Sequence, residues 1–425
     1  MTNLIRPDWN RFMPMKRAGS NALHRFVLYA FMFTLATCML PFINHCAAQK
    51  GSPPAEKTNA SVNTNFPQHE MFDDAMVSRL KVPEGFAVTV AATGLGKPRM
   101  MTFSDKGDLY VTRRDQGDVL QLIDTDHDGR FDQLHTVLSK FPGVHGIAIR
   151  DGYLYVISNR ELKRAKLQQD GSALEPELLI KDLPDGGQHG NRTIAFGPDG
   201  MLYISIGSDC NDCNESNPEH ATMVVARPDG SARRIYARGL RNTIGFDWHP
   251  QTKEMWGADN GTDWRGDDIP PEELNQIKEN AHYGWPLIYG KRIPDETREE
   301  PVGSTKKQFA STTEPSLIDF PAHSAPINLI FLTKAKSYPN EYQDDALISF
   351  HGSWNKKNPD GFKVVRVRFD NGRPGGMEDF LSGFLSADGS TRFGRPAGLA
   401  VSPSGNVYVS DDANGVIYCI KQGSK

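Results

Sequence analysis

A short pattern of apolar and polar residues recurs along the chain after residue 95. Each copy has a short apolar strand, a turn that contains Gly or Pro, and a second apolar strand that ends in polar residues. This alternation predicts half-buried strands joined by hairpin turns. Six copies are recognisable, the fifth being looser than the others: 100–121, 147–158, 194–207, 244–259, 327–350 and 399–411.

The spacing of these copies predicts the architecture. The first four begin about 45 to 50 residues apart, which is typical of propeller blades. A propeller closes with about four to eight blades. We therefore predict an all-β fold, a six-bladed β-propeller over residues 79–425, with an open β-sandwich as the alternative. Residues 286–315 are polar and lack the pattern, so we expect them to form an excursion over one face.

The N-terminus has the order of segments of a secretory signal. Lys16, Arg17 and Arg25 precede the apolar run 26–43, and the small residues 46–48 follow it. We predict a signal peptide over 1–48, with an uncleaved membrane anchor as the alternative. Residues 49–78 are polar and are predicted to be a flexible linker. The protein would then be exported, periplasmic or extracellular, and would contact a membrane only if the leader is uncleaved.

Charge and cysteine content limit the functional classes to which the protein can belong. The 425 residues carry a formal net charge of −4 without a basic run, which argues against a nucleic-acid partner. Cys210 and Cys213 form a C-x-x-C that we expect to be a disulfide in an oxidising compartment. Haem attachment would need His where Asn214 stands, and neither a thioredoxin-like unit nor a second zinc ligand pair is found. Cys419 is expected to be a buried apolar residue.

Polar residues stand immediately before several predicted inner strands. If the strand registers match, they point at one end of the central channel. A neutral His can accept a proton, and Arg binds carboxylates with two hydrogen bonds. The set predicts a site for an anionic, oxygen-rich ligand, the alternative being that each is a structural turn residue. Its members are His145, His189, Arg192, Arg241, Asn242 and Arg395.

Several ordered motifs resemble a known family. The run 187–200 (GQHGNRTIAFGPDG) resembles the H-x-x-x-R-(hydrophobic)-x-x-G-P-D-G run of pyrroloquinoline quinone (PQQ) sugar dehydrogenases. The runs 82–86, 97–99, 237–242 and 281–286 are similar to further family motifs, whereas 350–355 and 394–396 look closer to the sorbosone dehydrogenase branch. Over residues 80–421 the chain resembles the glucose/sorbosone dehydrogenase family.

The resemblance implies roles for individual residues. His189 matches the catalytic base that takes the proton of the substrate hydroxyl. Arg241 matches the Arg that stabilises charge on the quinone oxygen. In glucose dehydrogenases an Asp orients the base; Ser208 aligns with it here, and the adjacent Asp209 is expected to replace it. The residues expected to contact PQQ are His145, Arg192, Asn242, Trp354, Lys363, Arg392 and Arg395.

Calcium is the metal that the resemblance implies. The family binds it in the loop after blade four, here 261–268, where oxygen ligands are plentiful. The candidate ligands are Gly261, Thr262, Asp267 and Asp268, and the alternative is a set of solvated carboxylates. A second segment, Asp124-x-Asp126-x-Asp128-Gly129, opens like an EF-hand loop but has His135 at position twelve. It is interpreted as a weak calcium site or as a plain hairpin turn.

These expectations combine into one hypothesis. The chain would be an exported, PQQ- and Ca²⁺-dependent dehydrogenase that oxidises an aldose or sorbosone-like sugar and passes electrons to a soluble or respiratory acceptor. PQQ would supply the redox chemistry, and the protein would supply position and electrostatics. Two alternatives remain, a metal-dependent lactonase on a six-bladed propeller and a non-catalytic sugar- or ligand-binding propeller.

Overall fold

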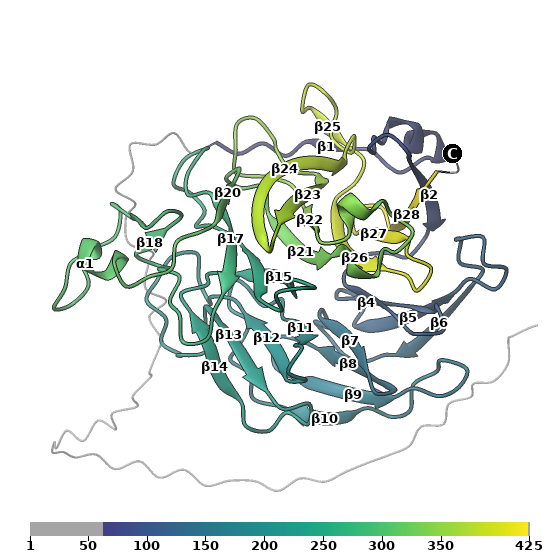
Figure 1. The fold of residues 1–425 in the computed structure, drawn as a ribbon, viewed down its shortest axis with the longest axis horizontal. Helices are drawn as coiled ribbons and strands as arrows, with labels where there is room; N and C mark the ends of the chain where they lie inside the picture. Colours follow the sequence, from purple (N-terminus) through teal and green to yellow (C-terminus); the bar gives the residue numbers. More distant parts are fainter. Residues whose placement is uncertain (1–62, 424–425) are drawn as a thin grey trace, which may run out of the picture. The chain divides into compact units, whose positions relative to one another are not determined.

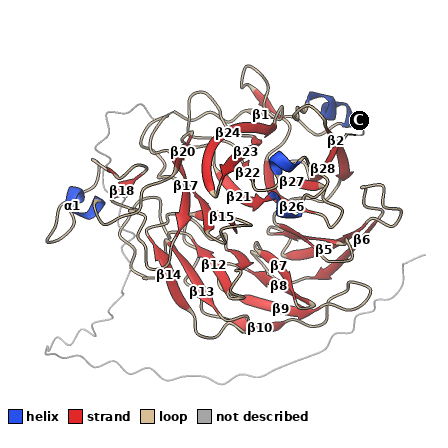
Figure 2. Ribbon diagram, viewed as in Figure 1, coloured by secondary structure: helices blue, strands red, loops and turns tan. Residues whose placement is uncertain are grey.

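A computed structural model describes residues 63–423. Six four-stranded antiparallel sheets stand around a central channel, which confirms the predicted six-bladed β-propeller (Figures 1 and 2). Blades one to three consist of β3 (Met101–Phe103), β4 (Leu109–Arg113), β5 (Asp118–Ile123) and β6 (Gln133–Leu138); β7 (Ile147–Arg150), β8 (Tyr153–Ile157), β9 (Leu162–Lys166) and β10 (Glu177–Ile180); β11 (Thr193–Phe196), β12 (Leu202–Ile206), β13 (Thr222–Ala226) and β14 (Arg234–Arg238).

Blades four to six complete the ring. They consist of β15 (Thr243–Trp248), β16 (Met255–Asp259), β17 (Glu272–Ile277) and β20 (Ile318–Phe320); β21 (Pro326–Phe331), β22 (Ala346–Phe350), β23 (Lys363–Asp370) and β24 (Arg373–Leu381); β26 (Pro396–Val401), β27 (Val407–Asp411), β28 (Val416–Gln422) and β2 (Phe86–Ala92).

The ring closes through a strand from the other end of the propeller sequence. Strand β2 precedes blade one in the chain but pairs antiparallel with β28, so that Val88 lies opposite Ile420. Blade six therefore contains strands from both ends of the propeller. This pairing ties the first blade to the last and leaves no gap in the ring.

The second strand of each blade is more buried than its alternating pattern predicts. All five residues of β12, β16, β22 and β27 are buried. Such a strand lies between neighbouring blades, so both of its faces are covered. Apolar clusters fill the spaces between blades, and the largest, between blades five and six, includes Phe380, Phe384, Phe393 and Tyr418.

The excursion at 286–315 lies between the third and fourth strands of blade four. It contains the hairpin β18 (Ile288–Tyr289) and β19 (Ile293–Pro294) and the helix α1 (Lys306–Ala310), and it extends sideways from the ring (Figure 1). Thr305 and Gln308 form a capping box at the start of α1. Arg298, in the same excursion, pairs with Asp212 in a loop of blade three.

Part of the predicted linker packs on the propeller. Strand β1 (Gln68–His69) pairs in parallel with β25 (Thr391–Arg392), and a 3₁₀ helix covers Asp74–Arg79. The backbone N–H of Asn65 also donates to the carbonyl of Trp354 at 2.9 Å. Residues 63–78 are therefore held by hydrogen bonds rather than free. The predicted signal peptide and the rest of the linker lie outside the described residues. Within residues 63–423, no helix has the length and apolar character needed to cross a bilayer.

Candidate functional site

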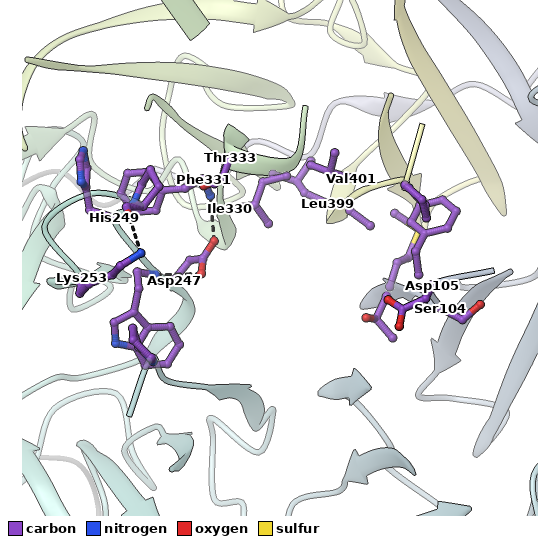
Figure 3. A pocket seen from close by; sticks show the side chains of 18 residues that line it. Ser104, Asp105, Asp247, His249, Lys253, Ile330, Phe331, Thr333, Leu399 and Val401 are labelled. Carbon is purple, nitrogen blue, oxygen red and sulfur yellow. Dashed lines mark hydrogen bonds between the residues drawn. The ribbon is translucent and has the colours of Figure 1, made fainter. Parts of the chain in front are cut away.

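The two ends of the channel differ in composition. At the strand-start end, the inner strands begin and the second strands finish, so the loops that carry the predicted site residues meet there. At the opposite, turn end lie the hairpin turns 198–200 and 403–405. A cavity of about 560 Å³ opens at the turn end between the ends of β3, β15, β21 and β26 (Figure 3). The predicted site residues lie at the other end.

His189 is the half-buried imidazole at the strand-start end. Its Nδ1 lies 2.8 Å from Ser208 Oγ and 3.1 Å from the Ser208 carbonyl oxygen. The single hydroxyl proton of Ser208 is donated to the carbonyl of Cys210 at 2.7 Å. Both Ser208 oxygens therefore accept from Nδ1, which must carry the ring proton. Nε2 is left with a lone pair, the form that a general base requires.

The electrostatics of His189 favour the same state. Burial, followed by the charge of Arg241, lowers the pKa of His189 to about 3. The imidazole is therefore neutral at pH 7. Asp209, expected to orient His189, is directed elsewhere, because its carboxylate lies 3.9 Å from His220 Nδ1. Ser208 takes the orienting position instead.

Arg241 is almost fully buried beside His189. Its Nε donates to the Asn211 carbonyl at 2.9 Å, and one Nη donates to Asn211 Oδ1 at 2.8 Å. A further contact of 3.2 Å joins it to the Asp263 carboxylate. These contacts hold at a fixed place the positive charge that acts on His189.

Asn242 follows Arg241 and borders the same space. The Asp259 carboxylate accepts from the backbone N–H groups of Arg241 and Asn242, at 2.9 and 2.8 Å, and so fixes the start of β15. A Cβ placed on Gly207 would lie 2.6 Å from His189 Cβ and 2.7 Å from Asn242 Oδ1. Only glycine at 207 therefore lets the two side chains approach each other.

A buried charge cluster occupies the other side of the strand-start end. Asp412 binds Arg99 at 2.5 Å and His351 Nε2 at 2.9 Å. Although burial acts in the opposite direction, His351 and Arg99 hold the pKa of Asp412 well below its usual range. Arg395 lies nearby and donates to the His351 carbonyl at 3.1 Å. Burial lowers the pKa of Arg395 to about 10, so it stays cationic at pH 7.

His145 joins the two sides but offers no free nitrogen. It is fully buried, with Nδ1 3.0 Å from the Arg192 carbonyl and Nε2 3.4 Å from Arg99. The first contact requires a proton on Nδ1, so Nε2 accepts from Arg99. Both ring nitrogens of His145 therefore form hydrogen bonds that join neighbouring loops.

Two guanidinium groups of the cluster are incompletely bonded. Nη1 of Arg392 and Nε of Arg99 are buried without a hydrogen-bond partner within residues 63–423. Buried, unpaired cationic donors are costly unless a ligand completes them. Both therefore fit an anionic, oxygen-rich ligand at this end of the channel.

Arg192 and Lys363 differ from their expected positions. The Arg192 side chain is fully buried and donates to the carbonyls of Pro184, Asp185 and His189. It therefore shapes the loop that carries His189 and does not line the channel. Lys363 begins the third strand of blade five and pairs with Asp379 of the outermost strand at 2.9 Å. The structure does not bring it to the cluster.

Trp354 belongs to an aromatic group with Phe66 and Trp264. Its ring stacks on Phe66 with a centroid separation of 6.1 Å and meets Trp264 edge-on at 4.8 Å. Phe66 comes from the N-terminal segment and is 71% exposed. The indole expected to cover the cofactor thus has one neighbour from outside the repeat.

The carboxylates proposed as calcium ligands do not converge. Asp267 accepts from Asn63 and from the backbone N–H of Lys357, while Asp268 is exposed, 3.7 Å from Lys356. Thr262 Oγ accepts from the Trp285 indole at 3.3 Å, and the Gly261 N–H donates to buried Glu272 at 2.6 Å. The backbone carbonyls of Gly261 and Thr262 remain the donors that suit the predicted ion.

The cysteine predictions are confirmed. Cys210 and Cys213 form a disulfide, and Cys419 is free and buried. In the hairpin 124–130, Asp124 accepts from the Gly129 N–H and Asp128 from the Arg130 N–H. These are the bonds of a hairpin turn, and the acidic oxygens there lie within 4.8 Å of one another.

A family model matches most of the chain. The model described as TrAA12-like covers residues 80–423, the whole propeller. The chain belongs to the TrAA12-like family. An uncharacterized protein of Borreliella burgdorferi is 29% identical over 362 residues, covering 81% of this chain and 91% of that protein.

Two fungal proteins are similar to this chain in sequence or fold. The pyrroloquinoline quinone-dependent pyranose dehydrogenase of Coprinopsis cinerea is 23% identical over 410 residues, which covers 81% of this chain and 55% of that enzyme. The holo form of its PQQ domain has a TM-score of 0.69 at 21% identity, covering 84% of this chain and 98% of that domain. A calcium structure of the Trichoderma reesei AA12 enzyme has a TM-score of 0.70 at 21% identity, with 86% and 100% covered.

Sequence reasoning missed Arg99, His351 and Asp412. Arg99 stands immediately before an inner strand, as His145 and Arg395 do, so the repeat position itself could have indicated it. His351 and Asp412 follow the second strands of blades five and six, which are the other loops that reach this end. Applying the repeat to both kinds of loop would have found all three.

Proposed function

We propose that this protein is a PQQ-dependent sugar dehydrogenase that oxidises a C–OH group of an aldose, pyranose or sorbosone-like sugar. The observation that carries the proposal is the proton-free Nε2 of a neutral His189 beside the buried charge of Arg241. The named enzymes in the family support it. The sorbosone branch, suggested by residues 350–355 and 394–396, remains a prediction.

The residues present fit PQQ. Its carboxylates require cationic donors, and Arg392 and Arg99 have buried guanidinium nitrogens that find no partner among residues 63–423. Arg395 adds positive charge, Asn242 borders the base, and Trp354 offers an aromatic face. When bound, PQQ supplies a two-electron acceptor for the hydride of the sugar.

The chain's own residues would handle the proton and the charge. His189 Nε2 takes the hydroxyl proton of the sugar, while Ser208 keeps the opposite nitrogen protonated. Arg241 favours negative charge that develops near it, and its contacts to Asn211 and Asp263 prevent it from moving away. Sugar oxidation would therefore depend on a base whose tautomer and cationic neighbour are set before the substrate arrives.

For calcium we propose the backbone carbonyls of Gly261 and Thr262, because Asp267 and Asp268 are directed elsewhere. We also propose export and electron transfer to a soluble or respiratory acceptor. The Cys210–Cys213 disulfide supports an oxidising compartment.

Reconstitution tests the proposal. The protein is mixed with PQQ and Ca²⁺, cofactor binding is followed by absorbance, and dye reduction is measured on a panel of sugars. We expect binding, sugar-dependent dye reduction, and loss of the reduction but not of the binding in His189→Ala. A control, Asp268→Asn, should leave the Ca²⁺ requirement within about twofold because this carboxylate is exposed.

Other outcomes would overturn the proposal. If the protein does not bind PQQ with Ca²⁺ present, it is a ligand-binding propeller or a lactonase. Hydrolysis of a lactone without PQQ would then identify it as a lactonase. PQQ binding without dye reduction on any sugar would indicate a non-catalytic propeller.

A further inference from the structure

The loop closed by the disulfide touches both central residues of the site. The carbonyl of Cys210 accepts the Ser208 hydroxyl, whose oxygen is one of the two Ser208 oxygens that accept from His189 Nδ1. The next residue, Asn211, receives Arg241 through its backbone carbonyl and its side-chain oxygen, at 2.9 and 2.8 Å. One short loop therefore contacts both the hydroxyl that helps to keep the ring proton on Nδ1 and the adjacent cation.

Asn211 also fixes the loop to the neighbouring blade. Its Oδ1 accepts from the Asp263 N–H at 2.9 Å, and its amide donates to the Asp263 carbonyl at 3.2 Å. Asp212 then forms ion pairs with Arg265 and Arg298, which come from blade four and its excursion. Asn211 and Asp212 thus fix the loop to different residues of blade four and its excursion, and the disulfide joins the two ends of the loop.

A disulfide at this separation stabilises the fold weakly. Its two cysteines are three residues apart, and the entropic stabilisation from a disulfide grows with the length of the loop it closes. Its main effect is therefore local: it restricts the backbone of 210–213, a segment without helix or strand, so that the Cys210 and Asn211 carbonyls keep their directions.

We propose that the Cys210–Cys213 disulfide and Asn211 form a positioning loop that helps to hold His189 in its Nδ1–H tautomer and keeps the charge of Arg241 near the imidazole. Opening the disulfide releases both groups and lowers the turnover of the enzyme. The effect on turnover rests on the proposed function, whereas the effect on the tautomer does not. Arg192, the other cation near His189, is held by carbonyls outside the loop and keeps its place.

The test compares oxidised and reduced full-length protein. Dithiothreitol breaks the S–S bond and gives two thiols; it supplies two electrons and two protons and becomes a cyclic disulfide. Mass spectrometry of the peptide that contains Cys210 and Cys213 shows whether the two cysteines are bonded or reduced. With PQQ and Ca²⁺ bound, we expect reduction to lower kcat at least about tenfold and to change KM less than about threefold, because a displaced catalytic group affects the reaction more than binding.

A second readout does not use activity. The ¹⁵N shifts of the His189 imidazole, assigned with His189→Gln, report the tautomer at pH 7. We expect Nδ1–H in the oxidised protein and a mixture of tautomers after reduction. If the oxidised protein never reduces the dye, the proposed function fails, and the ¹⁵N shifts still decide the positioning.

Two sets of variants provide controls. Cys210→Ser/Cys213→Ser should behave like the reduced protein and show no further loss with dithiothreitol. If that variant does not fold, Asn211→Ala leaves the disulfide intact and should lower kcat. Asn214→Ala, at the residue that follows the loop, should not lower kcat, because Asn214 contacts Arg298 instead. An unchanged tautomer and unchanged kcat after verified reduction would overturn the proposal.

Discussion

The two ends of the propeller channel use polar residues differently. At the turn end, Asp247 accepts from the backbone N–H groups of Trp248 and Phe331 (Figure 3). His249 Nδ1 accepts from the backbone N–H groups of Gln251 and Thr252. These side chains complete the backbone of turns. At the strand-start end, two guanidinium groups have buried donors without a partner in the described part of the propeller, and the base keeps a lone pair on Nε2.

The size of a cavity and the reactivity of the groups around it are separate properties in this protein. The turn end has a cavity of about 560 Å³ in which most lining groups are apolar or already hydrogen-bonded. One exception is His249 Nε2, which is buried without a partner in the described part of the chain. The strand-start end concentrates charges that are expensive to bury, a cost that proteins accept chiefly where a ligand or reaction uses them.

The sharpest test of this difference exchanges a histidine at each end. His189→Gln should lower kcat about 10²- to 10⁴-fold, since the general base is lost. His249→Gln, at the turn end, should leave kcat within about twofold. Steady-state dye reduction with PQQ and Ca²⁺ measures both, and equal losses in the two variants would contradict the comparison.

Removing the central carboxylate of the charge cluster should strongly destabilise the protein. Asp412→Asn leaves Arg99 and Arg395 poorly compensated and should lower the free energy of unfolding by about 3 kcal/mol at pH 7. The control Asp105→Asn changes an exposed carboxylate at the turn end and should stay within about 0.5 kcal/mol. Urea unfolding gives both values.

The effect of Asp412 should depend on pH in a definite direction. The pKa of Asp412 in the folded protein lies well below its usual value, so its stabilisation is complete above about pH 4 and declines as the pH falls further. The difference between wild type and Asp412→Asn should then shrink by about 1.4 kcal/mol per pH unit. A difference that grows in acid would show that Asp412 is not the ionised centre of the cluster.

A smaller effect is expected from the residue that orients the base. Ser208→Ala removes the hydroxyl but leaves its carbonyl near Nδ1, so kcat should fall about tenfold while PQQ binding is unchanged. Ser205→Ala, on the strand that precedes Ser208, removes a hydroxyl that accepts from the Thr193 N–H and should not change kcat. Equal activities of Ser208→Ala and wild type would mean that the carbonyl alone sets the tautomer.

The smallest effect is expected from filling the turn-end cavity. Thr333 lines it and is exposed, so Thr333→Trp can occupy part of its volume without displacing a buried side chain. The apparent Kd for PQQ and the KM for sugar should stay within about twofold. A large loss of binding would place the ligand at the turn end and contradict the proposed difference between the two ends of the channel.

Much of the fold could be predicted from the repeat. The six copies of the strand pattern coincide with the first two strands of the six blades, and their inner-strand starts placed His189, Arg241 and Arg395 at one end. Local periodicity carries this information because it reflects which side of each strand faces a neighbouring blade. The closing strand β2 was not predicted, because its partner β28 lies more than 300 residues away and neither strand specifies the other locally.

The chain by itself determined the blade number, the disulfide and the end of the channel at which charge gathers, because each depends on short spacings. Only the tertiary structure decided how those charges act. It gave the orienting position to Ser208 although Asp209 is the next residue, because the Asp209 carboxylate lies near His220 while both Ser208 oxygens lie beside His189 Nδ1. It also directed Arg192 into a loop and Asp267 toward Asn63. Such choices depend on partners distant in sequence, whose geometry exists only once the blades have packed together.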